Sequence, residues 1–150
     1  VVMMASLLLF AAVSVTAQGY YNPSYKITQH NLDKFLSTLP GWVKEVKAAG
    51  LDSNATGAQA LYQHNKVNGY LRSRGWGNPY HFYTILAKVS MAMAWIAIMN
   101  NPQISQAQRR QMEPQLMAGL AQLDPHERAV LRRNHSRLFH AMKKVSDRNR

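Results

Sequence analysis

The sequence has no cysteine, few acidic residues and no charged residue before Lys26. Without cysteine the chain cannot form a disulfide, bind a metal through thiolates, use a thiol nucleophile or carry a thioether-linked lipid anchor. Only seven Asp and Glu stand against 18 Lys and Arg, so paired carboxylates for acid–base catalysis are scarce. The formal net charge of +11 lies entirely from Lys26 onward. Such an excess favours contact with nucleic acid, anionic lipid or acidic polysaccharide.

Motifs for the common kinds of catalysis are also lacking. The sequence contains no Gly-x-Ser-x-Gly turn and no glycine-rich phosphate loop, and Gly75-Trp76-Gly77 is too short to act as one. None of the six histidines has another histidine three or four residues away, the spacing that places two metal ligands on one helical face. We therefore predict a protein that is not an enzyme, with no catalytic residue, no metal site and no cofactor.

The first seventeen residues have the pattern of a secretion signal. Residues 7–13 form a short apolar run, and Val15-Thr16-Ala17 places small residues at the first and third positions before polar Gln18. We expect cleavage after Ala17 and an exported mature protein, periplasmic or extracellular, without a transmembrane span. The alternative is an N-terminal core helix or an uncleaved anchor, although the run is shorter than the roughly 20 residues that span a membrane.

The rest of the chain is predicted to be all-α. Residues 18–27 are rich in turn formers and serve as a lead-in, after which apolar residues recur at helical spacing and no strand alternation is found. Leu32, Phe35, Leu36 and Leu39, for example, occupy one face of a helix that begins near residue 28. We expect a single helical domain over residues 28–146, followed by a frayed basic tail at 147–150.

One helix is expected to form the centre of this domain. Asn78-Pro79 is a strong start signal, a side-chain cap followed by proline in the first turn. Every residue from 91 to 99 is apolar, which is typical of a helix buried on all sides. We therefore predict a compact bundle of five or six helices around a central buried helix at about 79–99.

Two further helix starts carry capping boxes, Ser105 with Gln108 and Asp124 with Glu127. The last helix carries a basic stripe opposite its apolar face. Four basic side chains recur at spacings of four, three and four residues and three more widen the stripe: Arg133, Arg137, His140 and Lys144, then Arg128, Arg132 and Lys143.

The basic stripe has two interpretations, a solvated surface or a contact site for a polyanion. Export favours anionic lipid, lipopolysaccharide or another envelope polyanion as the partner. The same export argues against nucleic acid, as does the absence of aromatic residues on which bases could stack. Our leading hypothesis is a non-enzymatic exported protein that binds an anionic envelope component through its C-terminal helix.

The most distinctive segment is aromatic and lies at residues 76–83. Trp76, Tyr80, His81 and Tyr83 sit beside two glycines and a helix start, and could line a small-molecule or enzymatic pocket. The alternative is a corner at which the aromatic rings hold two helices together.

A holding chaperone for unfolded proteins is a further hypothesis. Residues 104–109 and 123–128 distantly resemble the Leu-Thr-x-x-Gln motif of small periplasmic helical stress chaperones. Because helix capping alone generates such hexamers, the resemblance supports no family assignment. It does agree with a small, basic, exported and methionine-containing helical protein.

Overall fold

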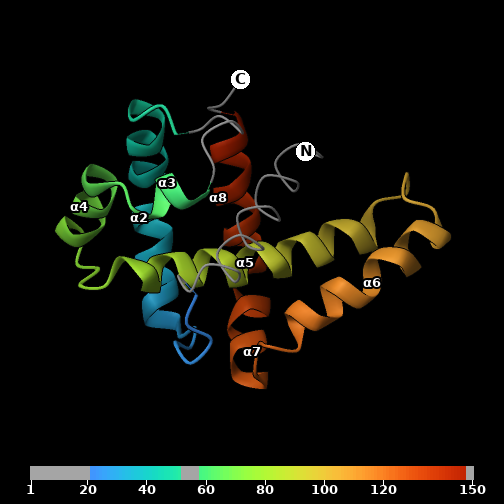
Figure 1. Cartoon of the computed structure of the whole chain (residues 1–150). Coiled ribbons are helices and arrows are strands. Elements are labelled where there is room, and N and C mark those ends of the chain that lie inside the picture. The colour runs from blue at the N-terminus through green and yellow to red at the C-terminus, as the bar shows by residue number, and fades with distance from the viewer. Residues whose placement is uncertain (1–20, 52–57, 148–150) are drawn as a thin grey trace.

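A computed structural model of the protein describes residues 21–51 and 58–147, and all regular secondary structure within these residues is helical (Figure 1). The all-α prediction is therefore confirmed. The seven helices in this part of the chain are α2 (Gln29–Ala48), α3 (Ala58–Tyr62), α4 (Asn65–Ser73), α5 (Pro79–Asn100), α6 (Gln106–Leu120), α7 (Pro125–Arg133) and α8 (His135–Asp147). The expected signal peptide, residues 18–20 of the lead-in and residues 148–150 of the tail lie outside the described residues.

The predicted number of five or six helices is wrong, because two segments that were expected to be continuous are divided. The segment after residue 58 breaks at Gln63 and His64, where the His64 side chain accepts the Val67 N–H and caps α4. The last helix breaks at Asn134. Sequence periodicity continues across both breaks, so spacing alone does not detect them.

The predicted helix starts are confirmed. Asn78 caps α5 with Pro79 in its first turn, and capping boxes open α6 at Ser105 and α7 at Asp124. α2 runs without interruption through Pro40 and begins with a capping box between Thr28 and Asn31. These side chains satisfy backbone donors that the first helical turn leaves without partners.

The core lies where α2, α4, α7 and α8 surround the first half of α5 (Figure 1). Residues 82–90 of α5 are buried without exception. Aromatic rings fill the centre: Phe82 lies 5.1 Å from Phe35 and 5.3 Å from Trp42 between ring centroids. Each such ring contributes roughly 1.5–3 kcal/mol on burial, so these rings add substantially to the stability of the core.

The second half of α5 does not have the surroundings that the sequence predicted. Beyond Ser90 it packs chiefly on α6, and the two helices extend as a hairpin from the rest of the molecule (Figure 1). Most of α6 is exposed, and Met99, Met112 and Met117 stand out as large exposed apolar side chains. The α5–α6 arm, residues 91–120, is therefore a two-helix structure, and α5 is buried on all sides only as far as Ser90.

The physical reason is that apolar composition permits burial but does not supply neighbours. The buried Ala94 lets one helix approach closely, and at Gly119 on α6 a Cβ atom would lie 2.7 Å from Met91 Sδ. By length and composition α5 also meets the criteria for a membrane span, but 61% of its most apolar window is buried inside the protein. That burial, centred on the first half of the helix, is typical of a core helix.

Candidate functional site

The cations predicted for the basic stripe all lie on the surface of α7 and α8. Exposed side chains are found at all seven positions: Arg128, Arg132 and Arg133 on α7, and Arg137, His140, Lys143 and Lys144 on α8. Because α7 and α8 are separate helices, the seven residues are distributed over two elements and do not form one continuous helical stripe. We call these seven residues the basic face.

Asn134 sets the position of α8 relative to the rest of the protein. Its buried side-chain amide donates to Gln29 Oε1 and to the Val130 carbonyl, both at 2.8 Å. Its carbonyl oxygen accepts from Gln29 Nε2 at 3.1 Å and from Arg137 at 2.9 Å. The turn between α7 and α8 is thus attached to the start of α2, and the residues of the basic face on α8 lie beside α2.

Two cations of the basic face have partners within the protein. Arg137 lies 2.7 Å from Asp33 Oδ1, and this hydrogen bond lowers the pKa of the Asp33 carboxyl group. Arg128 Nε donates to the Leu123 carbonyl at 3.0 Å, just beyond the end of α6. Among the side chains that the structure describes, which in α8 end at Val145, none of the other five residues has a carboxylate within 4.0 Å. Arg132, Arg133, Lys143 and Lys144 therefore present fixed positive charge to solvent.

An apolar groove of about 530 Å³ runs between α2 and α8. Five apolar residues line it: Leu36, Pro40 and Val43 from α2, and Ala141 and Val145 from α8. Its remaining lining comes from His140, Lys143 and Lys144, which belong to the basic face. The volume falls in the range of about 300–1,000 Å³ that is typical of small-molecule sites. Sequence analysis missed this groove and placed Leu36, one of its lining residues, on an apolar helix face.

The four aromatic candidates do not share one environment. Trp76 and Tyr83 are buried in the core: Trp76 Nε1 donates to Thr38 Oγ1 at 3.1 Å, and the Tyr83 hydroxyl donates to Asn68 Oδ1 at 3.0 Å. Desolvation raises the pKa of Tyr83 to about 12. These contacts match the alternative of a corner where rings hold helices together.

The other two aromatic candidates lie nearer the surface. Tyr80 is exposed on the first turn of α5, and the half-buried His81 ring stacks on Tyr25 with centroids 3.9 Å apart. The structure thus brings His81 to the lead-in and leaves Tyr80 at the surface. A ligand-binding role for this segment stays a prediction.

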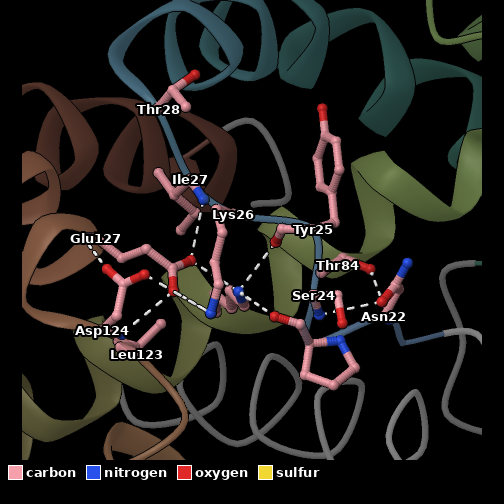
Figure 2. A network of polar contacts seen from close by, with 12 residues as sticks. Asn22, Ser24, Tyr25, Lys26, Ile27, Thr28, Thr84, Leu123, Asp124 and Glu127 are labelled. Atoms are coloured by element: carbon pink, nitrogen blue, oxygen red, sulfur yellow. Dashed lines mark hydrogen bonds and ion pairs between the residues drawn. The ribbon is translucent and has the colours of Figure 1, made fainter.

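The most strongly buried charges lie elsewhere, in an ion pair that sequence analysis did not predict (Figure 2). Lys88 of α5 and Glu127 of α7 are both fully buried, with Nζ and Oε2 2.7 Å apart. Glu127 Oε2 also accepts the Ile27 N–H at 2.9 Å, and Lys88 donates to the Tyr25 carbonyl at 3.0 Å. The signal was available: a lysine amid apolar residues of a core helix requires a buried acidic partner.

This network attaches the lead-in to α5 and α7. Glu127 Oε1 accepts the Asp124 N–H at 3.2 Å as part of the α7 capping box, so one carboxylate serves both the cap and the ion pair. The Glu127 N–H donates to Asp124 in return and lowers the pKa of that carboxyl group. Because both oxygens of Glu127 and the ammonium group of Lys88 have partners within the protein, we interpret the arrangement as a structural clasp.

Within the described residues, no three His, Asp or Glu side chains come together in a way that could hold a metal ion. No protein-family model, curated protein or solved structure matches this chain. What the protein does must therefore be inferred from its own residues. Two features stand out for that purpose, the basic face and the apolar groove that adjoins it.

Proposed function

We propose that this protein is an exported, non-enzymatic helical protein that binds an anionic component of the cell envelope through the basic face of α7 and α8. One observation carries the proposal: Arg132, Arg133, Lys143 and Lys144 are exposed and have no carboxylate within 4.0 Å among the side chains that the structure describes, which in α8 end at Val145. Cations that are already paired gain little from a new anionic partner, whereas unpaired cations gain attraction without breaking an existing contact.

Anionic lipid is the partner that we favour. A cationic residue near an anionic membrane surface contributes about 1 kcal/mol, so four unpaired cations give measurable affinity at low salt. The attraction is screened within a Debye length of about 8 Å at physiological ionic strength. Binding is therefore expected to weaken steeply as salt is added.

Vesicle flotation tests the proposal directly. The full chain should float with vesicles that contain 30 mol% phosphatidylglycerol at low salt, and much less with pure phosphatidylcholine or in 0.5 M NaCl. Replacing Arg132, Arg133, Lys143 and Lys144 by Gln should abolish the flotation. An absence of binding to the anionic vesicles at low ionic strength would contradict the proposal.

A matched control separates the basic face from net charge. Replacing Lys66, Arg72, Arg74 and Arg110 by Gln removes four positive charges from exposed positions on or next to α4 and α6. Both variants therefore fall from the same net charge of +11 by the same amount. If the two lose flotation equally, the protein binds by overall charge and the basic face has no special role.

A second candidate, the holding chaperone, is favoured by the α5–α6 arm. Met99, Met112 and Met117 are exposed there, and methionine surfaces adapt to many apolar partners. This function predicts that a stoichiometric amount of the protein suppresses light scattering by a reduced, aggregating client. Changing the three methionines to Gln should remove that suppression and leave vesicle flotation unchanged.

A further inference from the structure

The groove between α2 and α8 is lined by apolar side chains and by basic side chains. Its wall on α2 is apolar, formed by Leu36, Pro40 and Val43. On α8 the small side chain of Ala141 leaves space between the helices, and the lysines at 143 and 144 follow directly. Because apolar surface left in contact with water is unfavourable, a groove of this size favours an apolar occupant.

The charge at the groove restricts which apolar occupant fits. His140, Lys143 and Lys144 contribute to its lining, and the two lysines have no carboxylate within 4.0 Å among the side chains described as far as Val145. A neutral hydrocarbon would leave these ammonium groups without a partner. An occupant with a negatively charged end would match the apolar lining and the charged lining together.

We propose that the α2–α8 groove binds a single-chain anionic amphiphile, a molecule of the fatty-acid type, as a monomer. The acyl chain lies against Leu36, Pro40, Val43, Ala141 and Val145, and the carboxylate lies at Lys143 and Lys144. This inference builds on the proposed function, because it uses two lysines of the basic face, and it adds a ligand class that a flat membrane contact does not require.

Chain length is the first test, and it uses the unmodified protein. Isothermal titration with octanoate, decanoate and dodecanoate below their micellar concentrations should show affinity rising about fourfold for each methylene that enters the groove. Dodecanol and dodecyltrimethylammonium should bind much more weakly than dodecanoate, since the first lacks the charge and the second reverses it. Equal affinity across the chain lengths, or equal affinity for the three head groups, would overturn the proposal.

Filling the groove is the second test. Ala141→Phe places a ring in the space between α2 and α8 and should weaken dodecanoate binding at least tenfold. The control, Ala129→Phe, adds the same ring at an exposed position on α7 and should leave the affinity unchanged. Lys143→Gln with Lys144→Gln, which does not change packing, should weaken dodecanoate binding and leave dodecanol binding as it was. Unchanged dodecanoate affinity in both groove variants would overturn the assignment.

The outcomes separate this inference from the proposed function. If anionic vesicles bind and dodecanoate does not, the groove proposal fails and the proposed function stands. If dodecanoate binds and anionic vesicles do not, the proposed function fails while the groove proposal stands. Sedimentation of Ala141→Phe tests for another occupant: a change from dimer to monomer would show that a second copy fills the groove and would overturn the amphiphile proposal.

Discussion

The second half of α5 is the more apolar, yet the first half is the more buried. Residues 82–90, which include Thr84, Lys88 and Ser90, are all buried in the main core, whereas residues 91–100 pack chiefly on α6 and only Ala94 and Ile98 among them are buried. The comparison shows that the number of helices that reach a segment decides its burial, and that apolar composition only makes burial favourable. It also separates the molecule into a packed end, which carries the basic face and the groove, and the α5–α6 arm.

The largest expected effect is the loss of one member of the buried ion pair at the packed end. Glu127→Ala leaves Lys88 charged and buried without its acidic partner, which should cost about 3–5 kcal/mol of unfolding free energy. Urea unfolding followed by helical circular dichroism measures this change. The matched substitution on the arm, Glu113→Ala, removes the same side chain from an exposed position and should stay within about 0.5 kcal/mol of wild type. Equal losses of unfolding free energy in the two variants would contradict the difference between the packed end and the arm.

The two isoleucines of α5 give the next largest contrast. Ile85 is fully buried, so Ile85→Ala should destabilise the protein by about 2–5 kcal/mol. Ile96, one half-helix further along, is only half-buried, and Ile96→Ala should cost less than half as much. Urea midpoints of the two variants measure this difference in stability. A larger loss of stability in Ile96→Ala than in Ile85→Ala would contradict the difference between the two halves of α5.

Alkaline pH should weaken the packed end selectively. Burial raises the pKa of Tyr83 from 10.0 to about 12, so the folded state retains this proton where the unfolded state has lost it. The associated stability is complete below pH 10 and is lost as pH rises toward 12, by roughly 2–3 kcal/mol. Urea midpoints between pH 9 and 11.5 should fall in wild type and fall less in Tyr83→Phe. A slope that Tyr83→Phe leaves unchanged would contradict this account.

The smallest expected effect concerns the basic face itself. Its unpaired cations make no packed contact that stability requires, and each exposed substitution should change the unfolding free energy by no more than about 0.5 kcal/mol. The variant with Gln at 132, 133, 143 and 144 should therefore keep the thermal midpoint of wild type within a few degrees. A large loss of stability in this variant would show that these cations hold the fold together.

Sequence analysis predicted the local features well and the tertiary ones less well. The caps at Asn78, Ser105 and Asp124 depend on two or three neighbouring residues, and all three are confirmed. The break between α7 and α8 lies at Asn134, whose side chain forms hydrogen bonds with Gln29, more than 100 residues away. No local sequence pattern indicates this contact. The extent of α5 burial likewise depends on which helices fold back onto it.

In the candidate site, too, features set by neighbouring residues could be predicted, and features set by distant helices could not. All seven cations of the basic face could be predicted to be exposed, because they stand opposite an apolar helical face. The groove could not be predicted, since its lining residues come from two helices about 100 residues apart in the sequence, such as Pro40 of α2 and Ala141 of α8. The partnership of Lys88 with Glu127 was partly accessible, because the lysine required some acid and only seven exist in the chain.

Hydrogen exchange with and without dodecanoate is the most direct test of the central claim, that the ligand-binding surface lies at the packed end and not on the arm. The account predicts slower amide exchange on binding in residues 36–43 of α2 and 138–145 of α8, with residues 91–120 unchanged. Protection that appears on the arm while α2 and α8 stay the same would contradict it.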